Sequence, residues 1–314
     1  KTVTRDDGKI FPESLKASEI LNMLIKKSEA NGFPLLLKEH ITDISSDDSD
    51  GTYIVKTENS SFKTKKLVIA AGGMSYPKTG SDGSLYPLIE KLEIQMIPAR
   101  PALVPIYTHS YGYRSLSGIS FKAVLVRLLE NNREIAAQTG DMLLTHRAFS
   151  GPAILDISRY ADKGHKLEIN YIYPVTGQMA ADMIKADFQG NSRELHTYIS
   201  RIFKIPDAFA VKLIENAGIC PYMKTSCTEG DEITKIAEAL TCHRYAVSGT
   251  GSFSEAMVTA GGVSLDEVNL RNMESKKHSN LFFIGEVLDI DGDTGGFNLQ
   301  FAYSSAMAAV KNKK

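Results

Sequence analysis

The segment LFFIGEVLDIDGDTGGFNLQFAYSSAMAA, residues 281–309, decides the fold of this chain. Leu281 to Ile284 form a short apolar run, which is typical of a buried strand. The stretch from Asp289 to Gly296 is rich in aspartate and glycine, so it predicts an irregular loop. A helix of small residues is expected from Phe297 onward. The order is therefore a strand, a tight glycine loop and a helix.

The start of this helix predicts a ligand site. The first turn of a helix carries unpaired N–H groups and the positive end of the helix dipole. Gly295 and Gly296 would let a ligand approach that backbone closely. The segment therefore favours a seat for a phosphate or a flavin, and the alternative is an ordinary loop with a glycine-rich cap.

A calcium loop is excluded by counting. The aspartates of the loop fit positions 1, 3 and 5 of a calcium-binding loop, but position 6 is Thr294 and position 12 is Gln300. Those positions require Gly and Glu. We therefore predict no metal site.

Composition limits the classes of function. The chain has 314 residues, 43% of them hydrophobic, and its net charge is −1, so it can hold two or three domains and has no global field that favours nucleic acid. No apolar run approaches the length of a membrane span, and no signal peptide is visible. Its three cysteines match no zinc pattern. We expect a cytoplasmic protein with a small-molecule substrate and no nucleic-acid or membrane partner.

A second strand that ends in glycine lies near the N-terminal end. The pattern predicts a helix over 18–31, a strand over 33–44, and a hairpin over 52–57 and 61–65. A short apolar strand over 67–71 follows and ends at Gly72 and Gly73. In an open α/β sheet, ligands bind at the carboxyl ends of strands. The glycines after 67–71 and after 281–284 are therefore expected to face one site.

The middle of the chain has a different pattern. Alternating apolar residues over 121–129, a turn at Asn131 and Asn132, and a return over 134–145 predict antiparallel β structure. Residues 176–240 suit short helices broken by glycine and proline, and 245–262 is expected to be extended. An α/β unit is thus split by a long insertion.

Several motifs together resemble the HI0933-like (BaiN-like) flavoprotein family. They are LVIAAGGMSYPKTGSDG (67–83), LLTHRAFSGPAIL (143–155), EAMVTAGGVSLDEV (255–268), MESK (273–276) and the segment over 281–309. The resemblance covers nearly the whole chain in order. It implies an FAD-containing, NAD(P)H-linked oxidoreductase of glutathione-reductase-type α/β fold. The family begins with a G-x-G-x-x-G turn that this sequence does not show, so the fold is expected to be incomplete at its N-terminal βαβ unit.

The resemblance also implies a division into domains. Residues 1–100 and 263–314 would form a discontinuous FAD-binding domain. Residues 101–175 and 241–262 would form an inserted domain like a small β-barrel. Residues 176–240 would form a helical subdomain of that insertion.

The residues implied to bind FAD lie in three places. The first is Ile41, beside adenine. The second is the end of the strand over 67–71. The third is the last strand with the loop and helix that follow it. The complete set is Ile41, Ala71, Gly72, Gly73, Gly285, Glu286, Asp289, Gly295, Gly296, Phe297, Asn298 and Leu299. For Asp289 the alternative is a loop-stabilising Asx turn.

No catalytic residue is assigned, but three weak candidates stand out. Tyr76 has a phenol that can donate a proton, and the alternative is a surface turn. His146 could protonate a substrate, and Arg147 could hold a carboxylate or phosphate. The alternative for His146 is a turn cap.

The sequence therefore predicts an FAD-dependent oxidoreductase that acts on a small organic substrate, with its flavin reduced by NAD(P)H or by substrate. Two alternatives remain. One is a nucleic-acid or protein binding module built on the inserted barrel. The other is a flavoprotein fragment that folds without a cofactor.

Overall fold

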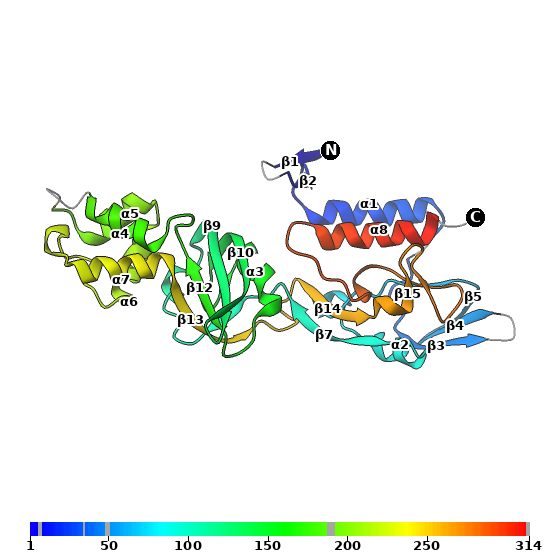
Figure 1. Ribbon diagram of the computed structural model, residues 1–314. Helices are drawn as coiled ribbons and strands as arrows, with labels where there is room; N and C mark the ends of the chain where they lie inside the picture. The colour runs from blue at the N-terminus through cyan, green and yellow to red at the C-terminus, as the bar shows by residue number, and fades with distance from the viewer. Residues whose placement is uncertain (6–7, 34, 48–50, 187–191, 312–314) are drawn as a thin grey trace. The chain divides into compact units, whose positions relative to one another are not determined.

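The computed structural model describes residues 1–5, 8–33, 35–47, 51–186 and 192–311 (Figure 1). Its backbone contacts divide the chain into two compact units. Unit 1 comprises residues 1–73, 81–99 and 261–314. Unit 2 comprises residues 74–80 and 100–260.

The sheet of unit 1 is built around the strand expected at 281–284. Its strand order is β15 (Val268–Asn269), β16 (Glu274–Ser275), β17 (Leu281–Phe283) and β6 (Leu67–Ile69). β17 is fully buried and runs parallel to β6, with Leu281 opposite Leu67 and Phe283 opposite Ile69. The carboxyl ends of these two strands therefore lie at the same edge of the sheet, which confirms that the two glycine-ended strands point to one place.

Helices and a meander complete unit 1. Its other elements are β1 (Thr2–Thr4), β2 (Ile10–Pro12), α1 (Ala17–Ala30), β3 (Ile41–Asp47), β4 (Thr52–Thr57), β5 (Ser61–Thr64), α2 (Tyr86–Lys91) and α8 (Phe297–Lys311). β3, β4 and β5 form an antiparallel sheet. α8 packs on the core through Phe301, Ala308 and Ala309, and the predicted hairpin and C-terminal helix are confirmed.

The strand expected over 33–44 is wrong for most of its length. Residue 34 lies outside the described residues. Residues 35–40 are irregular, and the strand begins only at Ile41. Lys38 has φ +60°, a left-handed conformation that an extended strand cannot contain. The apolar run Leu35–Leu37, which suggested a strand, is exposed.

The predicted helix over 18–31 is confirmed within one residue as α1, although its apolar residues are not buried. None of the residues of α1 is buried, and Leu21 and Leu24 are each 57% exposed. Hydrophobic periodicity therefore gave the element correctly but not its burial.

Unit 2 contains a closed six-stranded barrel, as the sequence predicted. The order around the barrel is β10 (Arg133–Leu144), β11 (Phe149–Ser150), β8 (Ile106–Thr108), β13 (His243–Thr250), β12 (Lys166–Asn170) and β9 (Ser120–Glu130). Asn131 and Asn132 join β9 to β10 with φ +50° and +62°, the backbone that a tight two-residue hairpin needs.

In the part of unit 2 that the structure describes, five α-helices accompany the barrel. α3 (Pro152–Ile157) follows β11, and four helices lie between β12 and β13: α4 (Gly177–Ala186), α5 (Leu195–Phe203), α6 (Asp207–Asn216) and α7 (Gly230–Thr241). Pro206 separates α5 from α6, and Gly218 and Pro221 separate α6 from α7, as expected. Gly190, also expected to break a helix, lies outside the described residues. One apolar core contains residues from both the barrel and these helices.

Two paired strands carry the chain between the units. β7 (Met96–Ala102) leaves unit 1 and β14 (Val258–Val263) returns to it. Gly262 has φ +124°, and a Cβ there would lie 2.4 Å from the carbonyl oxygen of Val287. The next residue, Val263, bridges Leu288 and accepts a hydrogen bond from the amide of Asp289. The return strand is thus locked against the loop after β17 by contact between backbones.

This contact predicts a strong effect of one methyl group. Gly262→Ala should lower the free energy of unfolding by ~3 kcal/mol or more, because both the backbone conformation and the contact with Val287 forbid a Cβ. Urea unfolding of the protein measures this loss of stability. Gly32→Ala is the control, since Gly32 has φ +76° and open space around it, and should cost only ~1 kcal/mol. Equal losses in the two variants would contradict the packing explanation.

Candidate functional site

The first part of the candidate site is the shared edge of β6 and β17. Gly72 follows β6 with φ +74°, and Gly285 follows β17 with φ +71°. A Cβ on Gly72 would lie 3.0 Å from the Ser81 hydroxyl, and one on Gly285 would touch Ala302 of α8. Left-handed glycines therefore end both strands where side chains have little room.

The second part is the start of α8, the helix whose residues Ala302 and Ser305 contact Gly285 after β17. Gly295 and Gly296 have φ +121° and +96°, and a Cβ on Gly296 would meet no atom within 4 Å. Within the described residues, no carbonyl oxygen accepts a hydrogen bond from the amides of Gly295 to Leu299. Phe297 and Leu299 are 63% and 80% exposed. α8 therefore begins with open amides, as a helix that receives an anion or a polar ligand must.

The α8 helix is fixed to the strand end by a hydroxyl. The Ser305 side chain is buried, accepts a hydrogen bond from the amide of Gly285 (2.9 Å) and donates to the carbonyl of Ala302 (3.1 Å). We call Gly72, Gly73, Gly285, Glu286 and residues 295–299 the cradle.

Two predicted cofactor residues use their side chains inside the protein. One oxygen of Asp289, Oδ1, accepts a hydrogen bond from the amide of Gly261 at 3.0 Å. The Asn298 amide group brackets Gly292, accepting from its N–H at 2.8 Å and donating to its carbonyl at 3.0 Å. Both side chains hold the loop after β17 in shape, and their contact with a cofactor stays a prediction.

The other predicted cofactor residues lie in the same unit. Ile41 begins β3 opposite Thr57 and packs on the unit 1 core, as does Ala71. Gly73 is buried and Glu286 is half-buried. Their roles toward a cofactor also stay predictions.

Tyr76 occupies a strained turn of unit 2. It has φ +55°, its side chain is 55% exposed, and its carbonyl accepts from both the amide and the hydroxyl of Thr79. The neighbouring Ser75 is buried against Thr259, 2.9 Å between hydroxyls. The phenol is thus presented outward from a fixed backbone.

His146 and Arg147 lie at the tip of a second tight turn. The Thr145 hydroxyl donates to the carbonyl of Ala148 (2.8 Å) and accepts from the Ala148 amide (3.0 Å). Both tip side chains are exposed. The alternative role expected for His146 was a turn cap. The hydroxyl of Thr145, and not His146, closes this turn.

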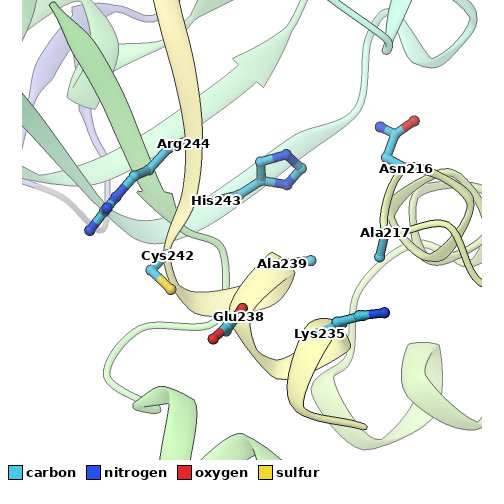
Figure 2. Close-up of a pocket in the computed structure, with 8 residues that line it drawn as sticks. All are labelled: Asn216, Ala217, Lys235, Glu238, Ala239, Cys242, His243 and Arg244. Atoms are coloured by element: carbon cyan, nitrogen blue, oxygen red, sulfur yellow. The ribbon is translucent and has the colours of Figure 1, made fainter. Parts of the chain in front are cut away.

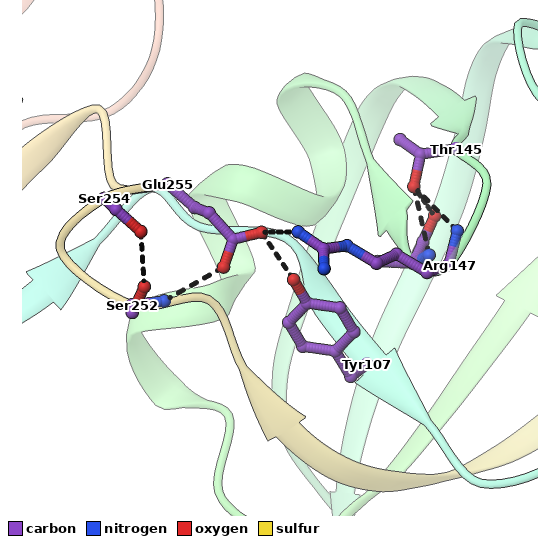
Figure 3. A network of polar contacts seen from close by, with 7 residues as sticks. Tyr107, Thr145, Arg147, Ser252, Ser254 and Glu255 are labelled. Atoms are coloured by element: carbon purple, nitrogen blue, oxygen red, sulfur yellow. Dashed lines mark hydrogen bonds and ion pairs between the residues drawn. The ribbon is translucent and has the colours of Figure 1, made fainter.

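Arg147 belongs to a polar network that sequence reasoning missed (Figure 3). Its guanidinium lies 3.1 Å from Oε1 of Glu255 and 5.8 Å from the ring centre of Tyr107. The Tyr107 hydroxyl donates to the same carboxylate oxygen, and the Ser252 amide lies 3.3 Å from the other. Hydrogen bonding by Tyr107 lowers the pKa of Glu255, and burial followed by the Glu255 contact raises the pKa of Tyr107. At neutral pH the network therefore holds an anion, a neutral phenol and a cation.

The signal for this network was weak. Glu255 opens the motif EAMVTAGGV, but Tyr107 lies 148 positions earlier on a short strand. Only the closure of the barrel brings them together.

Unit 2 also contains a cavity of about 500 Å³ at the start of β13 (Figure 2). It is bounded by Asn216 at the end of α6, by Lys235 and Glu238 of α7, and by His243. The His243 ring stacks on Tyr245, with centres 4.3 Å apart and planes 12° apart. Its mixed charges favour no particular ligand class.

Two properties of the described ranges bear on other functions. None of the helices there has the length and apolar character needed to cross a bilayer. No cluster of three histidine, cysteine, aspartate or glutamate side chains there is arranged to hold a metal ion.

A parallel strand pair with a glycine-rich edge and an open helix start is typical of Rossmann-type proteins. The chain matches the family described as HI0933-like protein Rossmann domain over residues 1–312, and it belongs to that family, a family of FAD-dependent oxidoreductases.

Three relatives match nearly the whole chain. A ribosomal RNA dihydrouridine synthase of Escherichia coli is 29% identical over 308 residues, which are 97% of this chain and 74% of that protein. A protein of the same name from Haemophilus influenzae is 29% identical over 96% of this chain and 74% of its own length. A 3-dehydro-bile acid delta(4,6)-reductase of Clostridium scindens is 25% identical over 96% of this chain and 74% of its own length. All three names are those of enzymes.

The half-buried His243 gives a pH prediction. Burial lowers the pKa of His243 below its ordinary value of 6.5. Below that value the unfolded chain binds a proton that the folded chain resists, so the free energy of unfolding should fall as the pH falls from about 7 to 5. His243→Gln should weaken this dependence in urea unfolding measured across that range, and the exposed His146→Gln should not. A slope in His243→Gln equal to that of the unchanged protein would contradict the prediction.

Proposed function

We propose that this chain binds FAD and reduces a carbon–carbon double bond conjugated to a carbonyl group. The names of the relatives support this reaction. A dihydrouridine is a uridine whose C5–C6 double bond, conjugated to a ring carbonyl, has been saturated. A delta(4,6)-reductase of a 3-oxo steroid saturates double bonds conjugated to the 3-oxo group. The two activities share one chemistry although their substrates differ.

The single observation that carries the proposal is the set of open amides at the start of α8 beside the ends of β6 and β17. These residues fit a dinucleotide. Gly72, Gly73 and Gly285 let a ligand approach the sheet edge closely, and the amides of residues 295–299 can donate to ligand oxygens. Within the described residues these amides have no competing carbonyl partner.

Bound FAD would supply a hydride to the β-carbon of the substrate. The chain contributes electrostatics to this reaction. The positive end of the α8 dipole favours negative charge on a group bound in the cradle, which makes electron uptake by that group easier. The protein also needs a proton donor for the α-carbon and a hydrogen-bond donor for the carbonyl oxygen.

Unit 2 offers the groups for those two tasks. Arg147 is held by Glu255 and presents an exposed cation that can bind a carbonyl or carboxylate oxygen. Tyr76 and His146 are exposed and can donate protons. We propose Arg147 for orientation of the substrate and keep Tyr76 and His146 as the candidate acids.

The finer features expected from the sequence belong to the same proposal. They are a glutathione-reductase-type fold for residues 1–100 and 263–314, an inserted barrel with a helical subdomain over 176–240, reduction of the flavin by NAD(P)H, a small-molecule substrate and a cytoplasmic location. The second candidate substrate is a uridine in RNA, favoured by the 29% identity to two relatives named for it.

Flavin binding and turnover test the proposal together. The purified protein should bind FAD, with quenched flavin fluorescence, and should consume NADH or NADPH when given a 3-oxo-Δ4 steroid or a uridine-containing RNA transcript. Mass spectrometry should show a gain of two hydrogen atoms in one of them. Failure to bind FAD by a folded protein would support the cofactor-free alternative and overturn the proposal. RNA binding without reduction would support the binding-module alternative.

A glycine pair supplies the matched control. Gly296→Ala places a methyl group at the open helix start and should weaken FAD binding tenfold or more. Gly118→Ala has nearly the same backbone cost, with φ +97° against +96° and open space at both positions, but it lies outside the cradle. Equal FAD affinities of the two variants would place the flavin elsewhere.

A further inference from the structure

The hydroxyl group of Tyr86 is buried and has no hydrogen-bond partner among the described residues. Tyr86 is the first residue of α2, and its ring packs on the core of unit 1. A buried hydroxyl without a partner is destabilising, so native proteins normally pair it with the protein, water or a ligand. The position therefore calls for an acceptor that the protein itself does not supply.

Tyr86 packs on the same apolar core as Ala71 and Ile284, the residues that precede Gly72 and Gly285. The loop before α2 contains Ser81, whose hydroxyl packs 3.0 Å from the position of a Cβ on Gly72. The charge of Glu286, in the turn after β17, also acts on the pKa of the phenol. Tyr86 thus shares its core with the ends of both glycine-ended strands.

The chemistry of Tyr86 and Glu286 limits which kind of ligand group can bind here. Burial, followed by the charge of Glu286, raises the pKa of Tyr86 to about 12, so the phenol is protonated at neutral pH and acts as a donor. The carboxylate of Glu286 repels a phosphate. A neutral alcohol suits both groups, because its oxygen accepts from the phenol and its proton can be donated to a carboxylate.

We propose that Tyr86 is a cofactor-positioning residue whose hydroxyl donates a hydrogen bond to a ribityl or ribose hydroxyl oxygen of bound FAD. This inference rests on the proposed function, since it assumes that FAD occupies the cradle. It adds a side chain to a cradle otherwise made mostly of backbone. It also accounts for a polar atom that the packing of unit 1 leaves unpaired.

The inference predicts opposite effects of Tyr86→Phe on two measurements. FAD titration by fluorescence quenching should show a Kd raised five- to tenfold, since one hydrogen bond is lost. Urea unfolding of the FAD-free protein should show an unchanged or higher midpoint, because the substitution removes an unpaired buried hydroxyl. A residue with only a structural role would not give this pair of results.

Tyr53→Phe is the matched control. Tyr53 is also buried in unit 1, but its hydroxyl donates to the carbonyl of Ser279 at 2.8 Å. This variant should lower the urea midpoint and leave the FAD Kd unchanged.

Three results would overturn the inference. If the unchanged protein binds FAD and Tyr86→Phe binds it equally well, the hydroxyl does not face the cofactor. If Tyr86→Phe lowers the urea midpoint of the FAD-free protein as Tyr53→Phe does, the Tyr86 hydroxyl already forms a hydrogen bond with a protein group or with water. If the unchanged protein binds no FAD, the proposed function fails and the inference fails with it.

Discussion

The parallel pairing of β6 with β17 is the interaction on which the rest of unit 1 depends. Three residues of each strand pair in register, and every residue of β17 is buried. This register places Gly72 and Gly285 at one edge and sets where the chain must turn into α8. Because ladder hydrogen bonds and apolar burial both fix it, a slip by one residue would turn Phe283 out of the core. The cradle is therefore a consequence of strand register more than of any polar side chain.

The loop between β17 and α8 shows how a site made of backbone is kept open. Polar side chains of the loop and of α8 are turned inward: Asp289 accepts from the amide of Gly261, Asn298 bonds both groups of Gly292, and Ser305 accepts from the amide of Gly285. These side chains satisfy donors around the site, while the first amides of α8 donate to no carbonyl oxygen of the described residues. In this loop aspartate and asparagine stabilise geometry, while the backbone is left to bind.

The sequence predicted those features that depend on local pattern. The apolar run over 281–284, the glycine loop and the small-residue helix were correct because each has a strong local signature, and Asn131–Asn132 correctly marked a hairpin. The strand over 33–44 failed because apolar content alone does not reveal the left-handed backbone at Lys38. The network of Tyr107, Arg147 and Glu255 could not be predicted, because barrel closure brings together residues from three distant segments. The unpaired hydroxyl of Tyr86 was equally hidden, since only packing shows which polar atoms lack partners.

The adjacency of β7 and β14 has a consequence for how such proteins diversify. Two of the four places where the chain passes between the units lie in this hydrogen-bonded strand pair, and the other two flank residues 74–80. An insertion joined in this way can be lengthened, trimmed or exchanged without altering the strand register of the host. The names of the relatives, which mention a ribosomal RNA and a bile acid, agree with a segment that can change while the paired strands stay the same.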